Sequence, residues 1–216
     1  MKQVLSDSER TLLEERIAEA EKQTGSQIVL ATVKRSDSYT EIPWKAFAIG
    51  ASLAGLLVFI LDLFVLGWLT EILILFSVVV VLGTGILFAL LSLIWPGFAR
   101  LFLSESRKET ETIQYAESLF LSNELFSTEG RRGILLLVSQ FERQVVILPD
   151  QGVRNLLSKE KLQALISNIT SHLRQKGIAK ALETGLVGIY DALGSPGSGG
   201  TISNELPDEI IEEEGI

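Results

Sequence analysis

The stretch "RGILLLVSQFERQVVILPDQGV", residues 132–153, contains two apolar runs that are separated by a very short link. The first run, residues 132–140, is almost continuously apolar and of strand length, a pattern typical of a strand buried on both faces. The second run, residues 143–150, is rich in β-branched residues and ends in a turn at Pro149 and Gly152. Because the link is so short, the two runs predict an antiparallel β-hairpin.

Further elements on both sides of this hairpin predict an α/β domain. Residues 6–24 predict a helix, since Ser6 and Glu9 have the spacing of a capping box. Residues 26–34 predict a strand. Three more helices are predicted over residues 105–126, 158–175 and 177–193. The first helix and strand could not bury their apolar faces alone, so we expect them to pack with the later elements in one domain.

Two long apolar runs interrupt this domain. Within residues 46–99 the only charged residues are Asp62 and Glu71. We predict a transmembrane helical hairpin over about residues 44–66 and 72–95, because a soluble domain of this size could not cover two such helices on all faces. Asp62 lies near the turn and is expected at the membrane interface. Two spans without other charges predict an anchor rather than a conduit.

Basic residues beside the two spans predict their orientation. They occur on both outer flanks and not in the turn between the spans: Lys34, Arg35, Lys45, Arg100, Arg107 and Lys108. The positive-inside rule then places both flanks, and with them the polar domain and both termini, in the cytoplasm. The first residues have no apolar segment typical of a signal peptide, which agrees with this orientation. We therefore expect a two-span protein of the inner (cytoplasmic) membrane.

The expected organisation has four segments. These are residues 1–43 (first helix and strand), 44–98 (transmembrane hairpin), 99–193 (remainder of the domain) and 194–216 (a flexible acidic tail). Six of the acidic residues lie in the tail, so most of the net charge of −8 belongs to it. No basic stripe is present, which argues against a nucleic-acid partner. The absence of cysteine excludes disulfides and thiolate metal sites.

Three stretches together resemble the TPM-domain family, which is named after thylakoid lumen, photosystem II repair and nematode receptor-modulator proteins. They are "TGSQIVLATV" (24–33), "STEGRRGILLLVSQFERQVVILPDQGV" (127–153) and "NELPD" (204–208). In the second stretch an Arg-x-Gly opens a buried strand and an Asp-x-Gly ends the next one. The resemblance implies an α/β/α sandwich around a small mixed sheet, interrupted here by the transmembrane hairpin. It also implies a range of activities, since some members resemble acid phosphatases and others are linked to calcium binding, photosystem repair or receptor modulation.

Asp150 is the first candidate for chemistry, both as a catalytic residue and as a metal ligand. It follows a predicted strand and precedes Gly152, and open α/β sheets place ligand groups at the carboxyl ends of strands. A carboxylate there could bind a hard cation such as Ca²⁺. The alternative is that Asp150 and Gly152 are turn residues, with the aspartate accepting hydrogen bonds from local amides.

Three charged residues are candidates for contacts with a ligand or a protein partner. Glu142 and Arg143 lie at the link between the two hairpin strands, and Arg132 precedes the first of them. Arg131 or Arg132 could hold a phosphate or a carboxylate. The alternative for Glu142 and Arg143 is a solvated hairpin tip. For Arg131 and Arg132 the alternative is a positive flank of the membrane or an ion pair with the acidic tail.

Two functions are compatible with these features. The first is a membrane-anchored TPM-like domain that binds a protein partner, with or without calcium, in membrane-protein assembly, quality control or stress response. The second is a phosphatase-like hydrolase of the same family that uses Asp150 and a divalent cation. The sequence contains no nucleophile elbow and no phosphate-binding glycine loop between a strand and a helix, which favours the first function.

Overall fold

The structure is a computed structural model, and it describes residues 5–66, 71–194, 206–207 and 210–215. The chain divides into two compact units. The first unit comprises Met1–Asp37 together with Lys108–Ile216, and the second comprises Ser38–Arg107. The second unit is therefore an insertion between two parts of the first.

A mixed four-stranded sheet forms the centre of the first unit, with the strand order β3-β2-β1-β4. The strands are β1 (Gln27–Arg35), β2 (Gly133–Ser139), β3 (Gln144–Pro149) and β4 (Ile211–Gly215). β1 pairs in parallel with both β2 and β4. β2 and β3 pair antiparallel, with Leu136 opposite Ile147. The predicted hairpin and the small mixed sheet are confirmed.

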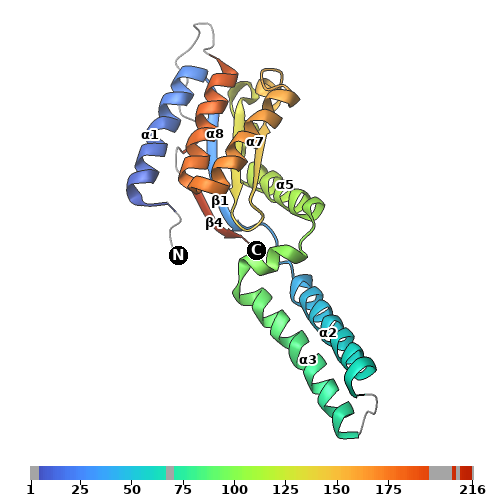
Figure 1. Cartoon of the computed structure of the whole chain (residues 1–216). Helices are drawn as coiled ribbons and strands as arrows, with labels where there is room; N and C mark the ends of the chain where they lie inside the picture. Colours follow the sequence, from blue (N-terminus) through green and yellow to red (C-terminus); the bar gives the residue numbers. More distant parts are fainter. Residues whose placement is uncertain (1–4, 67–70, 195–205, 208–209, 216) are drawn as a thin grey trace. The chain divides into compact units, whose positions relative to one another are not determined.

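Helices cover both faces of this sheet (Figure 1). One face carries α1 (Asp7–Thr24), α7 (Lys159–Lys176) and α8 (Ile178–Leu193), and the other carries α5 (Glu105–Ser122). Successive side chains of a strand point to opposite faces, so β1 supplies both cores. Ile28 and Leu30 pack with the three helices, whereas Val29 and Ala31 pack with α5. The predicted α/β/α sandwich is confirmed.

The helix ends follow local sequence signals. The Ser6 backbone N–H donates to Glu9 Oε2 at 2.9 Å, and the Glu9 N–H donates to Ser6 Oγ at 3.4 Å, which is the predicted capping box. α1 ends at Gly25, whose φ of 68° lies in the left-handed region. α5 ends before its predicted last residue because Glu124 takes a left-handed conformation with φ 52°. The remaining short elements are η1 (Asp62–Leu66), α4 (Pro96–Ala99), η2 (Arg100–Phe102), η3 (Leu125–Ser127), η4 (Glu129–Arg131) and α6 (Gln151–Arg154).

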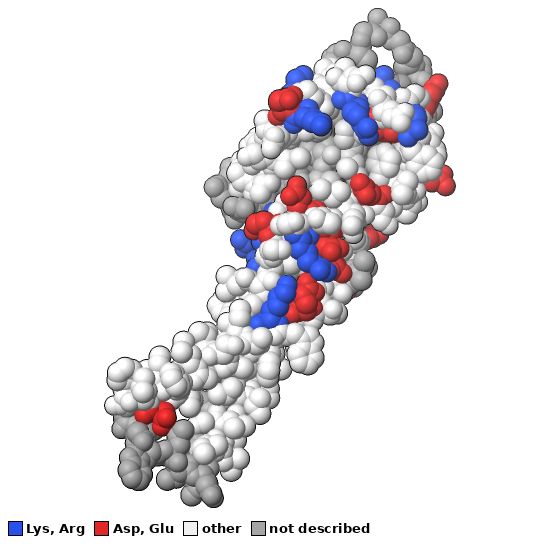
Figure 2. Space-filling view, turned by 90° about the vertical axis from the view of Figure 1, so that its right-hand side faces the viewer, with Lys and Arg blue, Asp and Glu red and all other residues white. Residues whose placement is uncertain are grey.

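The second unit contains two long apolar helices that pack against each other, α2 (Glu41–Leu61) and α3 (Glu71–Ile94). Their outward side chains are large, apolar and exposed, and this part of the chain is almost free of charged residues in Figure 2. Asp62 begins the π-helical turn that follows α2. The predicted turn around residues 67–71 lies mostly outside the described residues, which resume at 71. The two helices fit the predicted hairpin.

Small residues form the contact between α2 and α3. Ala46, Gly50 and Ala54 are buried on one side of α2 at intervals of four residues. Small residues at this spacing let two helices approach closely. A Cβ on Gly50 would lie 2.7 Å from the ring of Phe88 on α3, so that ring fills the space which the glycine leaves. This contact is visible in the sequence as the four-residue spacing of the small residues.

The acidic tail differs from the prediction. Residues 194–216 were expected to be a flexible tail, yet Ile211–Gly215 is strand β4 and completes the sheet beside β1. Ile210 is 3% exposed and packs in the core, which fixes the start of the strand. The edge of β1 offers unpaired backbone groups, and pairing them outweighs the acidic composition of the segment. Residues 195–205 lie outside the described residues.

Candidate functional site

The two ends of the family-like stretch 127–153 meet in one tight corner, where β2 begins and β3 ends. Two glycines permit this contact. A Cβ on Gly133 would lie 2.4 Å from the carbonyl oxygen of Leu125, and a Cβ on Gly152 would lie 2.1 Å from that of Gly130. Neither separation is compatible with a side chain, so the Arg-x-Gly and Asp-x-Gly patterns have a packing reason.

Asp150 is held at this corner by an arginine and by the backbone. Arg131 Nε donates to Asp150 Oδ2 and Arg131 Nη2 to Asp150 Oδ1, both at 2.9 Å. The Gln151 backbone N–H also donates to Oδ1 at 2.7 Å, so Asp150 caps the short helix α6. The Asp150 side chain is only 4% exposed, and its own backbone N–H donates to Gly133 O at 2.9 Å. Asp150 therefore ties α6 and the Arg131 turn to the start of β2.

These contacts do not fit a calcium site at Asp150. Both carboxylate oxygens already accept hydrogen bonds, and their nearest charged neighbour is a guanidinium. A hard cation requires several oxygen ligands and would have to displace Arg131. No group of three or more His, Cys, Asp or Glu side chains is placed to hold a metal within the part of the chain that the structure describes.

The position of Asp150 in the sheet also differs from the expectation. β3 runs antiparallel to β1 and β2, so its carboxyl end lies beside Gly133, where β2 begins. The carboxyl ends of the parallel strands are the usual ligand position in open α/β sheets, and they lie at the opposite end of this sheet. Asp150 thus lies at the end of the sheet where the parallel strands begin. Its contacts are those of a turn residue, as in the alternative given for it above.

Arg132 lies at the same end of the sheet as Asp150, but its side chain points toward α1. Its Nη2 donates to the carbonyl oxygen of Thr24 at 2.8 Å and thereby caps the last turn of α1. Its backbone N–H donates to Thr128 Oγ1 at 3.1 Å. These bonds give Arg132 a structural role in joining the end of α1 to the start of β2.

Glu142 and Arg143 lie at the opposite end of the sheet, where β1 and β2 end. The predicted contact residues therefore do not form one site. Glu142 is 3% exposed rather than solvated at a hairpin tip. It accepts hydrogen bonds from the Ser36 N–H at 2.9 Å and from the Ser139 hydroxyl, because the turn folds back over the end of β1. Arg143 is exposed, with a left-handed φ of 55°. Of the three predicted contact residues, Glu142 is buried, Arg132 is half-buried and Arg143 is exposed.

A groove of about 360 Å³ lies beside Asp150, between α5 and the end of β3. Phe120, Leu121 and Leu148 form its apolar lining. Arg131 and Arg154 contribute positive charge, and Glu117 and Asp150 contribute negative charge. Leu121 is 61% exposed, so it is accessible at the rim of this groove. No continuous stretch of the sequence signals this surface, because its residues come from three segments of the chain.

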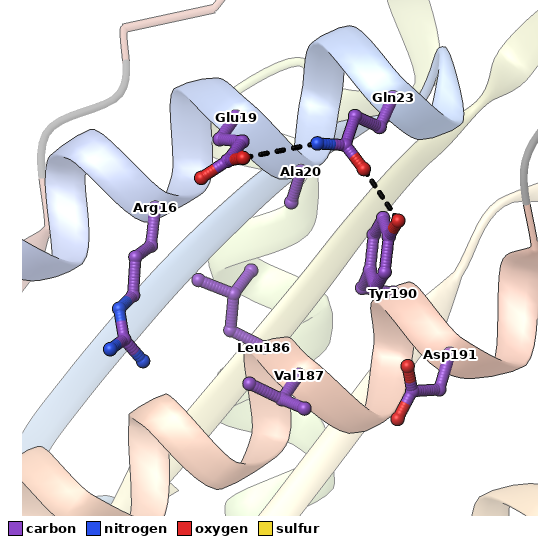
Figure 3. A pocket seen from close by; sticks show the side chains of 8 residues that line it. All are labelled: Arg16, Glu19, Ala20, Gln23, Leu186, Val187, Tyr190 and Asp191. Carbon is purple, nitrogen blue, oxygen red and sulfur yellow. Dashed lines mark hydrogen bonds between the residues drawn. The ribbon is translucent and has the colours of Figure 1, made fainter.

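A second hollow, of about 500 Å³, lies between α1 and α8. Figure 3 shows Arg16 reaching from α1 toward α8 at one end and Asp191 on α8 at the other. Tyr190 donates a hydrogen bond to Gln23 Oε1 at 2.5 Å, and Gln23 Nε2 donates to Glu19 at 3.1 Å. Arg16 is also paired with a glutamate of α8. The hollow is therefore polar at its rim and internally bonded.

The pKa of Asp150 gives a prediction for acid stability. Burial raises this pKa, but the hydrogen bonds from Arg131 and Gln151 outweigh it, and the net pKa lies below its ordinary value. A lowered native pKa stabilises the fold above the unfolded pKa, and this stability is lost as the pH falls through the native pKa. We expect the urea midpoint to fall between roughly pH 5 and pH 2, and to fall less in Asp150→Asn. Equal slopes in both proteins would contradict this assignment.

Comparisons with known proteins identify the family and agree with the fold. A family model described as the TPM domain matches residues 1–60 and 100–192. The solved structure of BA42 protein from the psychrophilic bacterium Bizionia argentinensis superposes with a TM-score of 0.58 and 15% sequence identity. The match covers 98% of this chain and 97% of that one, and at this identity it concerns the fold alone. None of the curated proteins matches the sequence.

Proposed function

The chain belongs to the TPM domain family, and on this premise we propose that it is a membrane-anchored accessory protein that binds a protein partner. It acts in the assembly, quality control or stress response of membrane proteins, with the TPM domain on the cytoplasmic side of the inner membrane. The observation that carries the proposal is the pair of long apolar helices inserted into the domain. The contacts of Asp150 with Arg131 favour this function over hydrolysis.

The two helices have the length and the surface of membrane spans. The apolar segments Glu41–Phe64 and Ile74–Ile94 contain 24 and 21 residues. At about 1.5 Å per residue, each is long enough for a hydrocarbon core of about 30 Å. Only 11% and 6% of their most apolar windows are buried, so the outward side chains need a cover that lipid supplies.

Charged residues at the base of the hairpin support the proposed orientation. Arg107 Nε lies 3.2 Å from Glu41 Oε1, and Lys45 Nζ lies 3.8 Å from the same oxygen. Arg107 also lies over the ring of Tyr39, with its Cζ 5.9 Å from the ring centroid. Cations at the end of a span are typical of the cytoplasmic interface, and aromatic rings are typical of either interface.

Replacing outward-facing leucines of the two helices by lysine tests whether these helices anchor the chain in the membrane. We expect the full chain to stay in the membrane pellet after alkaline carbonate extraction. Leu57→Lys with Leu87→Lys should release or destabilise it, because each charge costs about 2.5–3.5 kcal/mol near the centre of a span. Both leucines are more than half exposed. Leu12→Lys, on the exposed side of α1, is the control and should leave the pellet unchanged. Extraction of the unmodified chain by carbonate would contradict the anchor.

The groove beside Asp150 is the proposed surface for the partner. Its apolar lining fits an apolar side chain, and the Arg131 and Arg154 guanidiniums fit a neighbouring carboxylate. Arg131 is already paired with Asp150, so Arg154 is the better-placed cation for a partner. Partner surfaces commonly combine an apolar centre with a polar rim. The groove thus fits a partner segment that carries an apolar and an acidic residue side by side.

Site-specific photo-crosslinking in intact membranes tests the groove. A photoreactive residue at Leu121 should give a discrete crosslinked protein band. The same residue at Leu12, which is 47% exposed on α1, should not give that band. Adding Arg154→Glu to the Leu121 probe should weaken the band about tenfold or more, since a like charge then faces the acidic side chain. Identical bands from both positions, or a band insensitive to Arg154→Glu, would remove the groove from the proposal.

A further inference from the structure

Strand β4 occupies the edge of β1 through contacts that depend on its sequence. Its residues pair in parallel with Ala31–Arg35, in a register that places Thr32 beside Glu212 and Val33 beside Glu213. Figure 1 shows β4 alongside β1 in the sheet. Few side chains of β4 are covered, since its last three residues are exposed. Its hold on the sheet therefore depends on backbone pairing and on individual side-chain contacts.

Each of its three consecutive acids meets a different element of the domain. Arg10 of α1 donates to Glu212 at 2.5 Å, and Lys34 of β1 donates to Glu214 at 2.5 Å. On the other face of the sheet, the Tyr115 hydroxyl of α5 donates to Glu213. Burial and this bond raise the pKa of Tyr115, so the hydroxyl remains a donor. The alternation matches the side-chain period of a strand.

The residues on both sides of the acidic triplet are also specified. Ile210 is buried in the core on the α1 side, and Arg10 Nη1 donates to its carbonyl oxygen at 3.4 Å. Ile211 packs on the α5 side. Gly215 has φ 84°, and a Cβ there would lie 1.6 Å from the carbonyl oxygen of Arg35. The edge thus accepts two apolar residues, three acids and a glycine in this order.

We propose that the β1 edge, with Arg10, Lys34 and Tyr115, is a recognition site for this extended acidic segment, and that it takes the segment from a second copy of the chain as well as from its own. The identical segment of a second copy reproduces every contact described above. Residues 194–210 connect α8 to β4, and a connection of this length spans up to roughly 50 Å. Reciprocal exchange gives a closed pair without any new interface.

Two full-length variants with reversed charges test the exchange. The first carries Glu212→Lys, Glu213→Lys and Glu214→Lys, and the second carries Arg10→Glu and Lys34→Glu. In each variant alone, like charges face each other across the β1 edge. When the two are mixed, opposite charges meet only between chains. We expect a one-to-one complex in detergent by light scattering, at least about tenfold tighter than either variant with itself.

Amide hydrogen exchange decides where β4 lies. The amides of residues 211–215 should exchange fast in each variant alone and slowly in the mixture. Amides of β2 should stay protected in all samples, which shows that the domain is folded. Slow exchange of residues 211–215 in either variant alone, or no complex in the mixture, would overturn the proposal.

A peptide arm separates a second copy from another partner. A labelled peptide of residues 206–216 should bind the first variant, and the same peptide with its three final glutamates replaced by glutamine should bind about tenfold more weakly. Peptide binding without pairing of the two full chains would assign the edge to a different protein and overturn the exchange. Carbonate extraction and the Leu121 crosslink do not depend on β4, so the proposed function stands or falls separately.

Discussion

Gly152→Ala is expected to lower the free energy of unfolding by about 3 kcal/mol or more. The added methyl group would lie 2.1 Å from the carbonyl oxygen of Gly130 and 2.7 Å from that of Arg131. Both oxygens belong to the backbone, so a change of side-chain rotamer cannot relieve the clash. α6 must therefore move away from η4. Urea unfolding followed by circular dichroism measures the change. Loss of this contact also releases Asp150 from Arg131.

Gly83→Ala is the control for this substitution. Gly83 lies within α3, and nothing lies within 4 Å of a Cβ there. Its replacement should therefore not lower the free energy of unfolding, since alanine is favoured over glycine inside a helix. If both variants lost the same stability, the close approach at Gly152 would not be the reason for the Asp-x-Gly pattern.

Asp150→Ala is expected to lower the free energy of unfolding by about 2 kcal/mol, and to change no catalytic step directly. It removes the cap of α6, which is typically worth about 1 kcal/mol. It also leaves the guanidinium of Arg131 without its acceptor, at a similar cost. Thermal and urea unfolding of the full chain in detergent measure this loss.

A phosphomonoester assay separates the structural role of Asp150 from a catalytic one. Asp191→Ala is the control, because Asp191 is an exposed aspartate on α8. We expect any turnover by the Asp150 variant to follow its folded fraction. A variant that is as stable as the parent protein but loses a measurable turnover would favour the phosphatase-like alternative over the partner-binding function.

The inserted hairpin also affects how the domain folds. β1 is central in the sheet, yet Ile28 pairs with Ile134 across the whole inserted hairpin. The contacts of β1 with β2 can form only after both long helices have been synthesised, and such distant pairings slow folding. The hairpin and the domain are therefore linked in folding although they form separate compact units.

The sequence alone determined the features that depend on local patterns. The apolar runs with their short link defined the β2–β3 hairpin, and the capping box defined the start of α1. The two long uncharged segments defined α2 and α3. Each of these signals lies within one continuous stretch, where side-chain period and hydrophobicity decide the local structure.

Only the tertiary structure decided the roles of the charged residues. Asp150 and Arg131 lie 19 positions apart, Glu142 accepts from Ser36 across 106 positions, and Glu212 meets Arg10 across 202. A charged side chain carries no periodic signal that names its partner. The same acidic run is a solvated tail or an edge strand, depending on whether a neighbouring strand leaves its backbone groups unpaired. Whether such a strand is available depends on the assembled sheet, so it cannot be predicted from the acidic segment alone.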